Sequence, residues 1–175
     1  MLTLETERLT LRNWQETDVS NYMLLSQDVG YSCFSPPGRF LARTPGEARE
    51  KIETRMELFD RQKLGKFPVF LKSTGEFVGT CGMEPFELDG RSEVELGYRL
   101  CLKHWGYGYA KEAAEAILRY GFGPLNHARF MAFVFPQNRA SVKILEKLGF
   151  SYLQEFMHYD LPHRLYEMSH DRFNA

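Results

Sequence analysis

The chain has 175 residues, a formal net charge of −1 at pH 7, and 43% hydrophobic and 14% aromatic residues. This length suits one domain with a continuous core, so we expect a single domain over residues 1–175. The near-neutral charge argues against a nucleic-acid partner, because affinity for a phosphate backbone depends on clustered Lys and Arg. No segment has the length of a membrane span and no signal peptide is evident, so we expect a cytoplasmic protein without a membrane partner.

The cysteines and histidines give no sign of a structural cross-link or a metal. Cys33, Cys81 and Cys101 are odd in number, widely spaced and without Cys-x-x-Cys spacing, which predicts reduced thiols. The five histidines are scattered and lack His-x-x-x-His spacing. We therefore expect no metal site.

The first half of the chain alternates strand and helix patterns. The predicted elements are a strand over 8–12, a helix from about 18 to 26, a helix from 45 to 59, and strands over 67–71 and 77–83. Thr44-Pro45-Gly46-Glu47 resembles a capping box, which places the start of the second helix. Pro68 argues against full pairing of its strand. Residues 28–43 lose periodicity and are expected to form a loop, although they include three aromatics.

The second half has one strongly helical segment. Apolar residues recur there with the spacing of an amphipathic helix, at Ala110, Ala113, Ala114, Ile117 and Leu118. The other predicted elements are a hairpin turn at Asp89-Gly90, a strand over 93–100, a strand over 130–135 buried on both faces, a helix from Asn138 to Gly149, and strands over 152–159 and 164–168 connected through 161–163.

A glycine turn joins strand 93–100 to the helix that follows it. Gly106 and Gly108 allow positive φ angles and a close approach by a ligand. The unpaired N–H groups and the dipole of the helix N-terminus make the joint a cradle for phosphate oxygens. A nucleoside-triphosphate loop would require Gly-Lys-Ser/Thr, and a dinucleotide fingerprint would require glycine where Lys111 stands. A glycine turn that binds nothing remains an alternative.

The stretch Trp105-Gly106-Tyr107-Gly108-Tyr109-Ala110-Lys111-Glu112-Ala113 resembles the pyrophosphate motif of GNAT N-acetyltransferases, in the branch of the ribosomal-protein N-terminal (alanine/serine) acetylases. Further similar blocks stand in the family order at 5–12, 95–98, 138–141 and 145–150. The resemblance implies an α/β (α+β) fold with a mixed, mostly antiparallel sheet of six to seven strands and about four helices. It also implies that strand 93–100 splays from its neighbour.

Acetyl-CoA as co-substrate follows from the same resemblance. N–H groups from His104 to Ala110 would meet its pyrophosphate, with charge from Lys103 or Lys111, and backbone near Tyr98 to Leu100 would bind the pantetheine arm. The cofactor-binding residues that it implies are Tyr98, Leu100, Lys103, His104, Trp105, Gly106, Tyr107, Gly108, Tyr109, Ala110, Asn138 and Ser141. Lys103 departs from the Gln or Arg that often begins the family motif, and lysine lacks a planar fork for phosphate.

Two residues are the implied catalytic groups. Glu95 would take a proton from the acceptor amine, directly or through water. The alternative is that Glu95 belongs to a solvated strand face. The resemblance places many relatives' catalytic Tyr at Leu145, so Ser141 becomes the partner of the CoA sulfur, as donor or hydrogen-bond partner. Gly97 is compatible with a bulge or with relief of packing.

The leading hypothesis is direct transfer of an acetyl group to a primary amine, most simply a protein or peptide N-terminal α-amine. A small-molecule amine, such as an antibiotic or polyamine, is the alternative acceptor. A hypothesis of another class is a CoA-binding sensor module without turnover. Residues 31–40 and His158-Tyr159 are candidates for the acceptor's walls, and the absence of acids between Tyr31 and Thr44 argues against a polyamine. The sequence leaves a monomer and a homodimer both open.

Overall fold

The structure is a computed structural model that describes residues 1–35 and 41–173. In chain order its elements are β1 (Thr3–Glu5), β2 (Leu9–Arg12), η1 (Glu16–Asp18), α1 (Val19–Gln27), α2 (Val29–Ser32), α3 (Pro45–Gln62), β3 (Gly65–Leu71), β4 (Phe77–Leu88), β5 (Arg91–Leu100), η2 (Leu102–His104), α4 (Tyr109–Phe122), β6 (Arg129–Val134), α5 (Arg139–Leu148), β7 (Ser151–His158), β8 (Leu161–Ser169) and α6 (His170–Phe173).

The strands of this described part form one eight-stranded sheet in the order β1-β2-β3-β4-β5-β6-β8-β7. Neighbouring strands are antiparallel except β5 and β6, which are parallel. The expected mixed, mostly antiparallel sheet is therefore confirmed. The additional strand is β1, whose three residues are too short for a pattern to reveal them.

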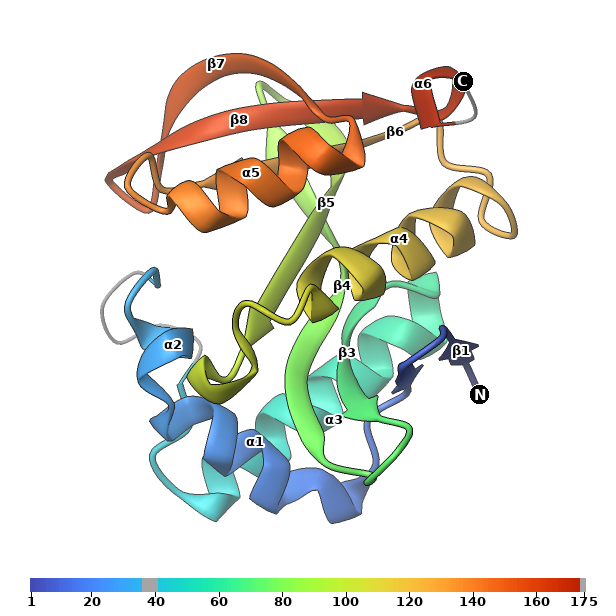
Figure 1. Cartoon of the computed structure of the whole chain (residues 1–175), viewed down its shortest axis with the longest axis vertical. Coiled ribbons are helices and arrows are strands. Elements are labelled where there is room, and N and C mark those ends of the chain that lie inside the picture. The colour runs from blue at the N-terminus through green and yellow to red at the C-terminus, as the bar shows by residue number, and fades with distance from the viewer. Residues whose placement is uncertain (36–40, 174–175) are drawn as a thin grey trace.

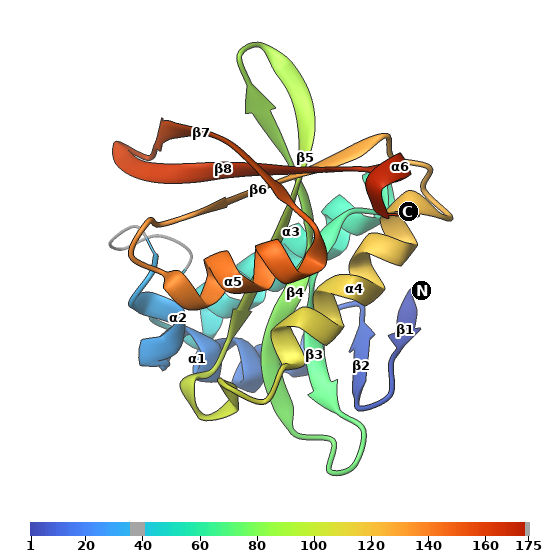
Figure 2. The same ribbon diagram turned by 45° about the horizontal axis from the view of Figure 1, so that its top comes forward.

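Helices cover both faces of the sheet (Figures 1 and 2). On the face of α4 and α5, buried side chains such as Leu96, Ile117 and Leu145 form the larger core cluster. On the face of α1 and α3, a second cluster includes Trp14, Tyr22 and Ile52. The two faces are therefore packed separately on either side of the central strands.

Several predicted boundaries were wrong. The segment expected to be a loop over 28–43 contains α2, because Asp28 accepts a hydrogen bond from the amide of Gly30 and caps a helical turn. The last hairpin turns at Tyr159 and Asp160, with φ of 52° and 59°, and not through 161–163. Neither residue is Gly or Pro, so the turn carried no strong signal. Residues 36–40 of the predicted loop lie outside the described residues.

The parallel contact between β5 and β6 is confined to one pair of the ladder, Glu95 opposite Met131. Beyond that pair β5 continues beside β4 as far as Leu100, while β6 continues beside β8. In Figures 1 and 2 the two strands diverge from this point. The sheet therefore splits in the second half of β5, between Glu95 and the end of the strand at Leu100.

We expect Gly121→Ala to destabilise the fold. A Cβ at Gly121 would lie 2.2 Å from Cζ of Phe130, whose ring is fully buried, so that the core must shift. Overpacking of this kind lowers the free energy of unfolding by about 1–3 kcal/mol, which urea denaturation would measure. The matched control is Gly46→Ala in α3, where the nearest atom is 3.7 Å away and the change should stay within about 1 kcal/mol. Equal effects would contradict the packing argument.

Candidate active site

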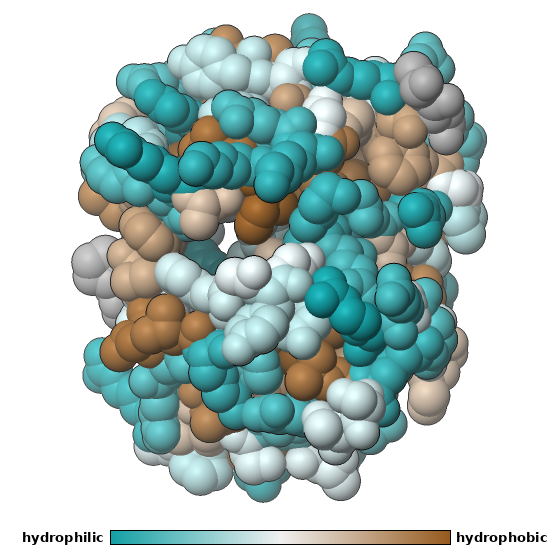
Figure 3. Space-filling model, in the orientation of Figure 1, coloured by the Kyte–Doolittle hydropathy of each residue, from teal (hydrophilic) through white to brown (hydrophobic). Residues whose placement is uncertain are grey.

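A cavity of about 460 Å³ occupies the split between β5 and β6. Figure 3 shows its hollow between α5 and the segment that leads into α4. Its walls come from α2, β4, β5, the glycine turn, α4, β6, α5 and the β7–β8 turn. The cavity is large enough for a substrate and brings together segments from most of the chain.

The glycine turn has the backbone geometry of an anion cradle. Gly106 and Gly108 have φ of 84° and 83°, and α4 begins at the next residue, Tyr109. The amides of residues 106–111 have no acceptor within the part of the chain that the structure describes. Unpaired amides at a helix N-terminus favour phosphate oxygens, so this turn fits the diphosphate of CoA.

Two predicted amides are not available for such a ligand. The amide of His104 donates to the carbonyl of Cys101 at 2.9 Å, and that of Trp105 donates to Leu102 at 3.1 Å. The sequence predicted that the backbone amides from His104 to Ala110 bind the diphosphate, and the structure leaves those of residues 106–110 available for it. The reason is that η2 ends in this segment and uses these N–H groups itself.

The predicted cofactor side chains are brought together with two exceptions. The cavity wall includes Tyr98, Leu100, His104, Trp105, Gly106, Gly108, Tyr109, Ala110, Asn138 and Ser141. Lys103 and Tyr107 are not part of it; the ammonium of Lys103 pairs with Glu76 at the surface. Lys111, the alternative rim cation, does line the cavity and pairs with Glu115.

The N-terminal segment holds the glycine turn in place. Glu112, in the first turn of α4, accepts hydrogen bonds from the Thr6 hydroxyl at 2.6 Å and the Arg8 amide at 2.9 Å. The Arg8 guanidinium donates to Glu112 at 2.7 Å and to the carbonyl of Tyr107 at 3.0 Å. The similar block at 5–12 thus has a structural reason, because it anchors the phosphate cradle.

Ser141 lies in a hydrogen-bonded group with a tyrosine from β5. Its Oγ is 3.0 Å from the Tyr98 hydroxyl, and its amide donates to Oδ1 of the N-cap residue Asn138 at 3.1 Å. Leu145 is buried in the core. Burial raises the pKa of Tyr98, and the hydrogen bond to Ser141 offsets only part of this, so the phenol keeps its proton. The pair therefore offers hydroxyl hydrogen-bond donors near α5.

Glu95 belongs to a buried ionic network. Its carboxylate lies 3.2 Å from the ammonium of Lys66, which is also 3.2 Å from Glu84. Glu84 in turn contacts Arg55 of α3 at 3.2 Å. Glu95 is only 8% exposed, which excludes the alternative of a solvated strand face.

The two carboxylates of this network have opposite pKa shifts. Burial raises the pKa of Glu95, and the single contact with Lys66 does not offset it. Burial has the same effect on Glu84, but Lys66 and Arg55 together outweigh it and lower its pKa to about 2. Glu84 is thus the permanent anion, and Glu95 is the carboxylate whose proton affinity suits a general base.

Gly97 makes room for the network. The ladder between β4 and β5 continues without a register shift, so the bulge considered at this position is absent there. A Cβ on Gly97 would lie 2.8 Å from Nζ of Lys66 and 2.9 Å from Oε1 of Glu95. The glycine therefore relieves packing around the ion pair.

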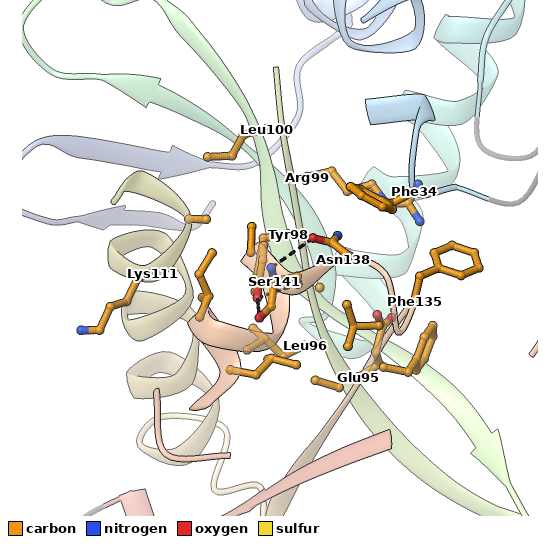
Figure 4. A pocket seen from close by; sticks show the side chains of 18 of the residues that line it. Phe34, Glu95, Leu96, Tyr98, Arg99, Leu100, Lys111, Phe135, Asn138 and Ser141 are labelled. Atoms are coloured by element: carbon orange, nitrogen blue, oxygen red, sulfur yellow. Dashed lines mark hydrogen bonds between the residues drawn. The ribbon is translucent and has the colours of Figure 1, made fainter. Parts of the chain in front are cut away.

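The cavity connects the two faces of the sheet. Along β5, Glu95 and Arg99 alternate with Leu96, Tyr98 and Leu100. Figure 4 shows Glu95 and Arg99 on one side of the strand, with Tyr98 and Ser141 on the other. A proton acceptor and a proton donor thus approach the cavity from opposite faces.

The predicted acceptor walls are partly present. Tyr31 and Phe34 line the cavity next to Arg99, whose guanidinium lies over the Tyr31 ring at 5.0 Å. His158 and Tyr159 line it from the β7–β8 turn. No cysteine lines it among the described residues, which is consistent with direct transfer.

Sequence reasoning missed Arg55, Lys66, Glu84 and the side chain of Tyr98. Lys66 lies just before the predicted strand 67–71, and Glu84 just after the predicted strand 77–83, so neither entered a strand-face argument. With the observed bounds, the register places Glu84 opposite Glu95. Strand ends are where such signals are weakest.

Two further searches of the described residues found nothing. None of their helices has the length and hydropathy of a bilayer-spanning helix. They contain no group of three or more His, Cys, Asp or Glu that could hold a metal ion.

Known proteins resemble this chain in sequence. The family model described as "Acetyltransferase (GNAT) domain" matches residues 8–151. The "Uncharacterized N-acetyltransferase p20" of Bacillus licheniformis is 34% identical over 162 residues, which cover 86% of this chain and 83% of that protein. The "Uncharacterized protein YkkB" of Bacillus subtilis (strain 168) is 40% identical over 96 residues, covering 55% of this chain and 56% of YkkB.

A solved structure resembles it in fold. The ribosomal L7/L12 α-N-protein acetyltransferase RimL, in complex with coenzyme A, aligns with a TM-score of 0.83 over 96% of this chain and 98% of that one. The identity of 15% makes this a likeness of fold alone. The match to the family model identifies an acetyltransferase, and the unpaired amides of the glycine turn fit the diphosphate of its coenzyme A substrate. The chain belongs to the GNAT family of acetyltransferases and is an acetyl-CoA-dependent acyltransferase.

We expect Lys66→Met to shift the pH dependence of catalysis. Loss of the cation 3.2 Å from Glu95 raises the carboxyl pKa further, so the acidic limb of the kcat/KM profile should move up by about 1 pH unit or more. When the parent protein and the variant are assayed with the same acceptor, the titration of the acceptor amine affects both pH profiles equally. Any difference between the two profiles therefore comes from the enzyme. Arg61→Met, which removes an exposed cation of α3 paired with Glu57, is the control. If the acidic limb of the kcat/KM profile did not move in Lys66→Met, Lys66 would not control the pKa of Glu95.

We expect Glu112→Gln to weaken acetyl-CoA binding and leave kcat nearly unchanged. The substitution removes the anion that fixes Thr6 and Arg8 against the glycine turn, so KM for acetyl-CoA should rise about 3- to 10-fold. Titration calorimetry with CoA would give the same change in Kd. Glu57→Gln, at an exposed position of α3, should bind CoA as the parent protein does. A fall in kcat alone would argue that the tether acts on chemistry and not on binding.

Proposed function

We propose that this enzyme transfers the acetyl group of acetyl-CoA to the α-amine of a peptide or protein N-terminus. The observation that carries the proposal is the position of Glu95 at the split of β5 and β6. Its carboxylate is buried beside Lys66 and has a raised pKa, and it faces the cavity from the side opposite Tyr98 and Ser141.

Acetyl-CoA supplies the activated acyl group as a thioester. The amine nitrogen forms a bond to the carbonyl carbon, the carbon–sulfur bond breaks, and the proton of the amine passes to Glu95. The departing thiolate accepts hydrogen bonds from the Ser141 and Tyr98 hydroxyls, which are 3.0 Å apart and keep their protons. Because the thiol pKa is about 8.5, the thiolate leaves with little assistance and takes its proton from water. The amides of residues 106–111 hold the diphosphate.

The acid–base requirement favours an α-amine. With reference pKa values of about 8 for an α-amine and about 10.4 for lysine, roughly a tenth of the former and about 0.04% of the latter is neutral at pH 7. An α-amine therefore needs about 3 kcal/mol less help from the base. A single carboxylate whose pKa is raised by burial suits the easier substrate.

The charge around Glu95 argues against a polyamine or aminoglycoside. Three cations, Arg55, Lys66 and Arg99, act on the two carboxylates Glu84 and Glu95. An acceptor with several ammonium groups would meet a net positive environment, where like charges repel. An acceptor with one titrating amine avoids this cost.

The test is a panel of acceptors incubated with acetyl-CoA and analysed by mass spectrometry. Peptides with an unmodified N-terminus should gain one acetyl group at the α-amine, and the same peptides with a blocked N-terminus but a free lysine should gain none. With the best peptide, Glu95→Gln should lower kcat by about 100- to 10,000-fold. Its affinity for CoA should stay within about threefold, because the diphosphate cradle is unchanged.

Acetylation of spermidine or an aminoglycoside, with no peptide modified, would sink the proposal in favour of a small-molecule acceptor. An unchanged kcat in Glu95→Gln would remove Glu95 as the base. Circular dichroism and the CoA titration show whether the variant is folded, so a lost rate can be assigned to chemistry.

A further inference from the structure

A group of aromatic rings lies on the acceptor side of Glu95 and takes no part in the chemistry described above. We name it the aromatic cup, and define it as Phe86, Phe133, Phe135, His158, Tyr159 and His163. All six line the cavity and come from β4, β6, the residue after β6, the end of β7, the β7–β8 turn and β8. The prediction of strand 130–135 as buried on both faces is wrong on this side, since Phe133 and Phe135 are only half-buried.

Strand register places the cup on the same face of the sheet as the catalytic carboxylate. Glu95 is opposite Met131, so Phe133, two residues along β6, has its side chain on that face. Glu84 is opposite Glu95, which puts Phe86 on the same face by the same alternation. Two strand residues span about 7 Å, so the cup begins one side chain's length from the carboxylate.

Ring contacts show that the cup is one continuous surface. Phe133 lies 5.6 Å from Phe86 and 4.3 Å from His158, and Phe135 lies 4.2 Å from His163, between ring centroids. His158 lies 4.1 Å from Tyr159. The rings therefore form a continuous concave surface against which a planar or bulky apolar group can pack.

The three phenylalanine rings of the cup are apolar, and His163 adds no charge beside them. Burial lowers the pKa of His163, and its Nδ1 donates to the carbonyl of Leu161 at 2.9 Å, so the ring is neutral and its polar atom is satisfied. The helices that pack on β6 and β8 are α5 and α6, whose apolar residues join the core on the other face. The half-buried rings thus remain available from the acceptor side.

From this geometry we propose that the aromatic cup binds the side chain of the acceptor's first residue and selects a large apolar, preferably aromatic, one. The proposal rests on the proposed function. When the α-amine of a peptide lies at Glu95, the Cα bonded to that amine carries the side chain of the first residue. The aromatic cup begins about one side chain's length from Glu95, where this side chain would lie. Small first residues such as Ala or Ser would leave the rings in contact with water. A second ammonium group would gain little there and would meet Lys66 and Arg99, which line the same cavity.

The experiment compares peptides that differ only at the first residue, Phe, Leu, Ala, Ser or Lys, followed by one common sequence. We expect kcat/KM for the Phe peptide to exceed that for the Ala peptide by about 10- to 100-fold, with Lys the poorest. Phe133→Ala should reduce the Phe-to-Ala ratio towards one, and Phe133→Leu should reduce it less. Tyr152→Ala, on the exposed opposite side of the β7–β8 hairpin beside Tyr166, should leave the ratio unchanged.

The outcomes separate this proposal from the proposed function. Acetylation of every peptide with the Ala or Ser peptide preferred overturns the cup's role and leaves N-terminal acetylation standing. Acetylation of 2-phenylethylamine with no peptide modified overturns peptide acceptance itself. Analytical ultracentrifugation of the parent protein and of Phe133→Ala tests whether a second copy of the chain occupies the cup. If the parent protein is a dimer and Phe133→Ala is a monomer, the cup is a dimer interface and the proposal is overturned. A ratio that falls in Phe133→Ala, with CoA binding unchanged, supports it.

Discussion

The active site depends on how briefly β5 and β6 pair. Two parallel strands that paired along their whole length would close the sheet, and the cavity would not exist. Instead they share one pair of the ladder, at Glu95 and Met131, and then each follows a different antiparallel neighbour. Twist in each half of the sheet separates the strands further. The split therefore opens a passage between the two faces, which Glu95, Ser141 and the glycine turn all border.

The two faces of the sheet place chemically different groups at the passage. On the side of α4 and α5, unpaired amides, a tyrosine and a serine suit a phosphorylated thioester. On the other side, a buried network of Arg55, Lys66 and Glu84 sets the charge of Glu95. Lys66 lies beside both carboxylates, but Glu84 also contacts Arg55, so the pKa of Glu84 is lowered while burial keeps that of Glu95 raised. A base and an anchoring anion are thus made from the same residue type.

The acceptor side also shows why a small cavity can be selective. Its charged part is paired internally, so a ligand gains little from a second cation there. Its apolar part is an incomplete shell of rings, where contact area depends on the size of the group that enters. In this arrangement Glu95 would recognise the reacting amine, and the aromatic cup would recognise the side chain. Reactivity and substrate selection would then depend on different parts of the site.

The sequence by itself determined the cofactor half of this protein. The glycine turn, the helix after it and the Asn138 cap depend on local backbone geometry, so Gly106, Gly108 and Asn138 could be named in advance, and the family resemblance added Ser141. Only the tertiary structure decided the acceptor half. Lys66 and Glu84 lie just outside predicted strands, and Phe133 lies in a strand predicted to be buried on both faces. These three residues are far apart in the chain, and their meeting depends on strand register and on the split of the sheet. Register follows from packing across the whole sheet, which no short stretch of sequence contains.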